Sequence, residues 1–130
     1  MPRIWRKQRQ AFTLVEIMII VALIGLLAAL AVPTFIKARK QSQAKRIVND
    51  ARIIDAAVDA WAFEKGKKDN DPIGAADLLV IAQYTKAGFI STTDLLGNSY
   101  TIGPVGTNQV LISPDTKDAL SGVSVDWGPY

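Results

Sequence analysis

The sequence predicts an α+β protein in which one long N-terminal helix packs against a small antiparallel β-sheet. Two observations support this: an unbroken apolar stretch that continues into an amphipathic segment, and short alternating segments that follow it. The chain has 130 residues, the size of one domain. We expect a basic leader peptide over residues 1–11, a transmembrane helix over 12–36, and a globular head over 37–130 that includes the amphipathic half of the helix.

The composition excludes most familiar catalytic sites. The chain has no cysteine and no histidine, which excludes disulfides, thiol nucleophiles, Ser-His-Asp triads and the commonest zinc sites. We therefore expect no enzymatic activity. The formal charge is +3, but four of the 15 basic residues precede the apolar stretch, which leaves 11 against 12 acidic ones. A basic leader on a nearly neutral body is typical of a targeting segment rather than of nucleic-acid binding.

Residues 12–36 form the apolar stretch, with Thr13, Glu16 and Thr34 as the only polar side chains. As a helix, these residues would extend about 37 Å, enough to cross a hydrocarbon core of about 30 Å. The stretch is apolar on all sides, so membrane lipid is the expected partner. Gly25 and Pro33 weaken or bend a helix, although membrane helices tolerate both.

The segment after the apolar stretch becomes amphipathic. Its apolar residues are spaced 3, 4, 3, 4 and 3 apart, at Ala44, Ile47, Ala51, Ile54, Val58 and Trp61. This spacing predicts one continuous helix from about Thr13 to Lys65, with Gly66 as its C-terminal cap. We expect the spaced residues to form the seam on which the head packs, with Phe63, Phe89 and Tyr100 also in the core.

The rest of the head is predicted from shorter signals. The sequence predicts a solvent-exposed loop over residues 66–72 and a short helix from Ala75 to Tyr84. Three segments have strand character: Ser99 to Gly103, Gln109 to Ser113, and Gly122 to Asp126. Pro104 to Asn108 would join the first two as a hairpin loop. Such a sheet is too small to be stable alone, so it must pack on the amphipathic helix.

The N-terminus carries a specific motif. The basic leader, the sequence Phe12-Thr-Leu-Val-Glu16 and the apolar stretch together resemble the class III signal of type IV prepilins and type II secretion pseudopilins. The resemblance implies that a prepilin peptidase cuts between Ala11 and Phe12 on the cytoplasmic side and that Phe12 is N-methylated. These families usually carry glycine where this chain has Ala11. The resemblance further implies that Glu16 neutralises the new amino group of Phe12 on a neighbouring subunit.

By this resemblance the chain is a structural subunit of a type IV pilus-like or type II secretion pseudopilus filament. The precursor would cross the bacterial inner membrane once, with its head in the periplasm. An inner-membrane assembly platform would then incorporate it into a periplasmic or extracellular filament whose core is the helix over 12–36. Gly25 and Pro33 lie where these families carry a helix-loosening glycine and proline. They are either a segment that unwinds on leaving the bilayer or irregularities that a membrane helix tolerates.

A second resemblance lies in the head. Asp94-Leu-Leu-Gly-Asn-Ser-Tyr100 is similar to the Asp-Pro-x-Gly-Asn-x-Tyr element of major pseudopilins and short pilins, with Leu95 in place of proline. The ending Val125-Asp126-Trp127 is similar to the acidic-aromatic ending of the same group. Whether the filament serves secretion, twitching, adhesion or DNA uptake is left open by these motifs.

Two groups of charged residues each have two interpretations. Asp115, Asp118 and Asp126 gather near the C-terminus, where similar pseudopilins bind calcium, or they are ordinary solvated side chains. The basic cluster after the apolar stretch either contacts lipid headgroups or captures DNA. Because no aromatic residue interleaves with these cations, we do not expect nucleic-acid binding. The cluster comprises Lys37, Arg39, Lys40, Lys45 and Arg46.

One alternative comes from a different class of protein. The basic leader, the apolar core and Ala29-Leu30-Ala31 also satisfy the pattern of a conventional signal peptide. A cut after Ala31 would release a soluble periplasmic protein that begins at Val32. Glu16 is out of place in such a signal core, which favours the filament interpretation.

Overall fold

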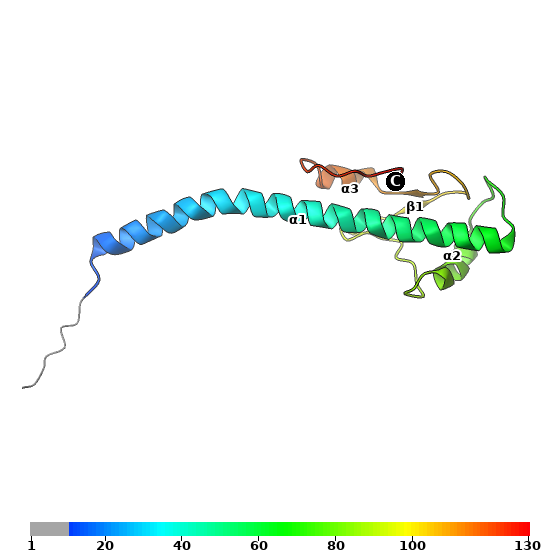
Figure 1. Ribbon diagram of the computed structural model, residues 1–130, viewed down its shortest axis with the longest axis horizontal. Helices are drawn as coiled ribbons and strands as arrows, with labels where there is room; N and C mark the ends of the chain where they lie inside the picture. Colours follow the sequence, from blue (N-terminus) through cyan, green and yellow to red (C-terminus); the bar gives the residue numbers. More distant parts are fainter. Residues whose placement is uncertain (1–10) are drawn as a thin grey trace, which may run out of the picture. The chain divides into compact units, whose positions relative to one another are not determined.

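The computed structural model describes residues 11–130 (Figure 1). The predicted leader, apart from Ala11, lies outside the described residues. The chain divides into two compact units, one up to Ile36 and the other from Lys37 to Tyr130. Helix α1, Leu14–Lys65, is a single element of 52 residues that belongs to both. The predicted long helix is thereby confirmed to within one residue at its start.

In the first unit, α1 is exposed along its whole length. An 18-residue window of this helix has a mean hydropathy of 2.8, and none of that window is buried. It is the one helix among residues 11–130 that is long and apolar enough to cross a membrane. Gly25 has no heavy atom within 4 Å of the position that a Cβ would occupy. Pro33 lies inside α1 without ending it.

The C-terminal end of α1 is capped as predicted. Gly66 has a φ of 62°, which an L-amino acid with a Cβ adopts only at a cost. The Lys67 amide donates to the Ala62 carbonyl at 2.9 Å, and the Gly66 amide donates to the Phe63 carbonyl at 3.3 Å. This pair of hydrogen bonds is the Schellman motif, which satisfies carbonyl groups that the helix end would otherwise leave unpaired.

The core of the head lies along one face of the second half of α1. All six residues of the predicted seam are buried, from Ala44 to Trp61. The core is completed by residues from the following segments, which include Ile81, Val105, Val110, Ile112 and Leu120. Helix α2, Ala75–Ile81, continues into the 3-10 turn η1, Ala82–Tyr84, so the predicted short helix is confirmed.

The sheet is a single hairpin. Strand β1, Thr101–Ile102, pairs antiparallel with β2, Val110–Leu111, in the register Thr101 with Leu111. The Gly103 amide donates to the Gln109 carbonyl at 2.8 Å and closes the predicted loop. The first two predicted strands are therefore present, although each is shorter than predicted.

The third predicted strand is wrong. Residues 122–126 form irregular backbone, with no ladder hydrogen bond to another described residue. Their side chains alternate in burial as a strand's would, and Val125 and Trp127 pack against the core. The alternating burial of these side chains therefore results from packing on the head's core and not from pairing with another strand. The preceding segment forms α3, Pro114–Ala119, which the sequence analysis missed although Ser113-Pro114 is a common helix start.

Two of the three aromatic core predictions are also wrong. Tyr100 is buried as predicted, and its hydroxyl donates to the Ile47 carbonyl at 3.4 Å. Phe63 is 92% exposed and Phe89 is 67% exposed. Phe63 follows Trp61 and Ala62 in sequence but lies on the opposite face of α1, because successive residues of a helix are rotated by about 100°.

Candidate functional site

The predicted processing junction lies just before α1. Ala11, Phe12 and Thr13 are non-helical and exposed, and the helix starts at Leu14. The Glu16 amide donates to the Thr13 hydroxyl at 3.2 Å, so Thr13 acts as the N-cap. The Thr-x-x-Glu spacing is the sequence signature of a capping box. The Ala11–Phe12 peptide bond therefore lies outside the helix, in an exposed part of the chain.

Glu16 is the only charged side chain between Ala11 and Ile36. It lies in the first turn of α1, where the helix dipole favours a negative charge. Its carboxylate forms no salt bridge or hydrogen bond with any residue of the described range 11–130. The backbone amide of Glu16 thus takes part in the helix cap, whereas its carboxylate has no partner among the described residues.

The Asp94–Tyr100 element forms a closed loop that is tied to α3. One Asp94 carboxylate oxygen accepts from the Leu96 amide at 2.8 Å and from the Asn98 amide at 3.0 Å. The other oxygen accepts from the Thr116 hydroxyl, which in turn accepts from the Asn98 side chain at 2.9 Å. Gly97 has a φ of 88°, which explains a glycine at this position. The element holds α3 in place and offers no catalytic group.

Tyr100 ends this element inside the core. Burial raises the pKa of its hydroxyl well above the ordinary value, and the Asp50 and Asp94 carboxylates raise the pKa further. The Tyr100 side chain therefore stays neutral at any physiological pH and serves as a hydrogen-bond donor.

The C-terminal aspartates do not come together in one site. Asp115 and Asp118 lie on α3, and Asp126 lies on the irregular segment that follows. One Asp126 oxygen accepts from the Gly128 amide at 2.9 Å. Residues 11–130 contain no group of three acidic side chains that could hold a metal ion. The carboxylates alone therefore do not fit a calcium site, and a bound ion would need backbone carbonyls for most of its ligands.

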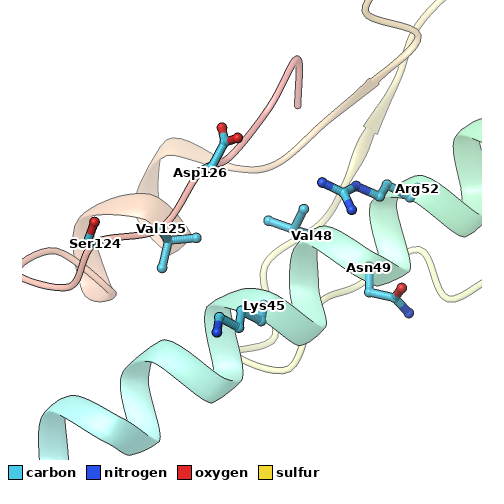
Figure 2. Close-up of a pocket in the computed structure, with 7 residues that line it drawn as sticks. All are labelled: Lys45, Val48, Asn49, Arg52, Ser124, Val125 and Asp126. Carbon is cyan, nitrogen blue, oxygen red and sulfur yellow. The ribbon is translucent and has the colours of Figure 1, made fainter.

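A groove of about 280 Å³ separates the C-terminal segment from α1 within the head (Figure 2). Val48 and Val125 face it, and Lys45 and Arg52 border it on the α1 side. The Asp126 carboxylate is turned away from both cations in Figure 2, and no salt bridge joins them among the described residues. The basic cluster from Lys37 to Arg46 is otherwise exposed, with Lys40 half-buried, and no aromatic residue lies within it.

Comparisons with known proteins agree with the N-terminal motif. The family model described as the prokaryotic N-terminal methylation motif matches residues 6–32. Fimbrial protein Q of Moraxella bovis is 30% identical over 120 residues, which cover 88% of this chain and 76% of that protein. The type II secretion system core protein G of Escherichia coli is 28% identical over 94% of this chain and 92% of its own length.

A third relative matches a shorter part of the chain. The type IV major pilin protein PilA of Myxococcus xanthus is 56% identical over 60 residues, which cover 46% of this chain and 27% of that protein. No solved structure matches the chain. The methylation motif extends over the alternative cut after Ala31, which would fall inside α1. The conventional signal-peptide alternative is therefore set aside.

Proposed function

This chain belongs to the type IV pilin-like proteins, and we propose that it joins its filament after a cut between Ala11 and Phe12. The chain is a prepilin-type structural subunit, and its relatives are structural pilins and pseudopilins. Its long apolar N-terminal helix fits an inner-membrane anchor. The observation that supports the position of the cut is the exposed, non-helical Ala11–Phe12 bond directly before the capped start of α1.

The processing proceeds as follows. A prepilin peptidase on the cytoplasmic side hydrolyses the Ala11–Phe12 bond, and the new Phe12 amino group receives a methyl group. The subunit stays in the inner membrane through residues 12–36, with the head in the periplasm. An assembly platform then moves it into a filament, where lipid around the exposed first half of α1 is replaced by the same helix of other copies. Catalysis is no part of this function.

The experiment is intact-mass analysis of the protein extracted from membranes. We expect a mature chain that begins at Phe12 and carries one added methyl group. Two substitutions distinguish the proposed cut after Ala11 from the alternative cut after Ala31. Ala11→Leu enlarges the residue before the proposed cut and should leave the leader attached, whereas Ala31→Leu should be processed normally. A mature N-terminus at Val32, lost in Ala31→Leu, would contradict the proposal.

A further inference from the structure

The basic cluster from Lys37 to Arg46 carries positive charge that the head does not compensate. No acidic residue occurs in the sequence between Glu16 and Asp50. None of the five basic side chains forms a salt bridge with another residue of the range 11–130. Four of the five are exposed, and Lys40 is half-buried. The cluster therefore attracts an anionic partner from outside the head.

The first three cations of the cluster are distributed around the helix, and we call them the collar. Because successive residues of an α-helix are rotated by about 100°, Lys37, Arg39 and Lys40 lie at about 0°, 200° and 300° around the axis of α1. The two lysines are on the side of α1 that carries the core residues Ala44 and Ile47, and the arginine is on the opposite side. A protein or a DNA duplex contacts a helix from one side, whereas a membrane surface surrounds it. The distribution of the collar therefore favours a membrane surface.

The position of the collar along α1 matches the level of lipid headgroups. The collar starts at the residue that follows Ile36, the last residue of the apolar stretch, and α1 is continuous there. From Lys37 to Lys40 the helix rises about 5 Å, and the headgroup region of one leaflet is about 5–7 Å thick. Arg46 lies about 14 Å beyond Lys37 along the axis, outside this layer. When residues 12–36 span a bilayer, the collar is therefore the part of the basic cluster that meets the headgroups.

We propose that the collar binds the headgroups of anionic phospholipids in the membrane that holds the subunit before assembly. Each basic residue near an anionic membrane surface strengthens the attraction about fivefold, and the effect falls off within a Debye length of about 8 Å. The three collar residues therefore supply most of the attraction. This inference rests on the proposed function, because it assumes that residues 12–36 lie in a membrane.

The rest of the head has the opposite net charge. Residues 47–130 contain six basic and eleven acidic residues, so the excess positive charge of the head lies entirely in the basic cluster. An anionic membrane surface attracts the start of the head and repels the remainder. Binding at the collar thus keeps only the first turns of the head at the membrane surface.

Lipid titration of the full chain, extracted from membranes in detergent, tests the collar. Native mass spectrometry measures the binding of phosphatidylglycerol and of phosphatidylcholine with the same acyl chains, so any difference in affinity comes from the headgroup. We expect phosphatidylglycerol to bind about tenfold or more tightly, with a preference that weakens as salt is added. In the triple variant Lys37→Gln, Arg39→Gln and Lys40→Gln the preference should fall to about twofold or less, because glutamine removes the charge but keeps a similar helix propensity.

The matched control removes three cations elsewhere on the head. Lys65→Gln, Lys68→Gln and Lys86→Gln together change the net charge by the same amount, and all three residues are exposed. This variant should keep the full preference for phosphatidylglycerol. Neither triple variant should change the melting temperature of the chain in detergent, since surface substitutions of this kind have small effects on stability.

Two other anionic ligands are tested in the same way. Displacement of phosphatidylglycerol by equimolar inorganic phosphate would show a site for free phosphate and overturn the inference. Tighter binding of a short DNA duplex than of phosphatidylglycerol, lost in the collar variant, would also overturn it. Equal affinity for the two lipids, or an equal loss of preference in both triple variants, would do the same.

The intact mass of the same samples separates this inference from the proposed function. A chain that begins at Phe12 but shows no lipid preference would overturn the collar alone. A chain that keeps its leader would overturn the proposed cut. The collar would still be tested in that case, because both triple variants carry the same leader.

Discussion

At the scale of single residues, we expect Glu16 to control assembly without affecting folding. Its carboxylate is unpaired among the described residues, while its amide completes the cap of α1. A carboxylate at the centre of a membrane span costs about 2.5–3.5 kcal/mol, and Glu16, near the start of the span, pays less there than in a dry filament core, where the Phe12 amine is also penalised. Pairing of the two groups between copies would remove both penalties.

We expect Glu16→Ala to be inserted and processed normally but to form few filaments. Removing one member of a buried pair leaves the other charge uncompensated, at a cost of about 3–5 kcal/mol, so filament yield should fall by about tenfold or more. Electron microscopy of sheared filaments and intact mass measure the two properties. Thr13→Ala is the control, since it removes the cap, worth about 1 kcal/mol, but keeps the carboxylate. Normal filaments from Glu16→Ala would refute the pairing.

Gln109 ties the hairpin to α1. Only 1% of this residue is exposed, and its side-chain amide donates to the Asp59 carboxylate at 2.7 Å and to the Asp55 carbonyl at 3.2 Å. Its side-chain oxygen accepts from the Gly106 amide at 3.0 Å. All of its hydrogen-bonding atoms are therefore used, as burial requires.

Gln109→Leu should destabilise the head by about 1–3 kcal/mol, because it keeps the side-chain size and leaves the Gly106 amide without its partner. Urea unfolding of a fragment that comprises residues 37–130 measures the change. Thr107→Ala is the matched control in the same loop, and we expect its effect to stay within about 0.5 kcal/mol because Thr107 is exposed. Equal unfolding midpoints for Gln109→Leu and the unsubstituted fragment would show that the buried hydrogen bonds do not stabilise the fold.

Among the elements, α1 depends on a single residue for its C-terminal end. Gly66 has a φ of 62° and open space around the position of a Cβ, so Gly66→Ala would be disfavoured by backbone conformation alone. We expect a loss of about 1 kcal/mol, or roughly 4–8 °C in the melting temperature of the same fragment. Gly103→Ala is the control, because its φ lies outside the left-handed region and the nearest atom to its Cβ is 4.0 Å away. Equal melting temperatures for Gly66→Ala and Gly103→Ala would show that the cap at Gly66 does not limit the stability of the fragment.

The elements that could be predicted from sequence are those encoded by neighbouring residues. The 3-and-4 spacing from Ala44 to Trp61, the cap at Gly66 and the hairpin loop at Pro104 to Asn108 are all local patterns. The third strand was wrongly predicted because alternating burial arises equally when an irregular segment packs directly on a helix. Helix α3 has one buried residue, Thr116, and so offered no apolar period.

For the candidate site too, local motifs could be predicted from the sequence and contacts between distant residues could not. The Ala11–Phe12 junction and Glu16 lie in one continuous motif, so the sequence alone is enough to predict them as a site. The link between Asp94 and Thr116 joins residues 22 positions apart, and no local spacing indicates it. The exposure of Phe63 and Phe89 depends on which face of the head remains uncovered, which hydrophobicity alone cannot tell.

At the scale of the whole molecule, the two units differ in whether they have a buried core of their own. The first unit has no buried core among its described residues and needs lipid or other copies to cover it. The head has its own core, so a fragment of residues 37–130 should fold, dissolve and stay monomeric at low concentration. Its stability should be small, because fewer than about 100 residues bury a limited core and no disulfide assists them.

Because its free energy of unfolding should be small, the fragment is a sensitive probe of calcium binding. An ion that binds only the folded form stabilises it by about 2.7 kcal/mol at a hundredfold excess over Kd, which raises the melting temperature of a head this size by roughly 10 °C or more. We expect thermal melts with excess calcium and with chelator to superimpose, because Asp115, Asp118 and Asp126 form no cluster. A calcium-dependent rise that disappears in Asp118→Ala and Asp126→Ala would contradict this expectation. It would mean that backbone carbonyls near α3 complete a site around these carboxylates, since calcium accepts both kinds of oxygen ligand.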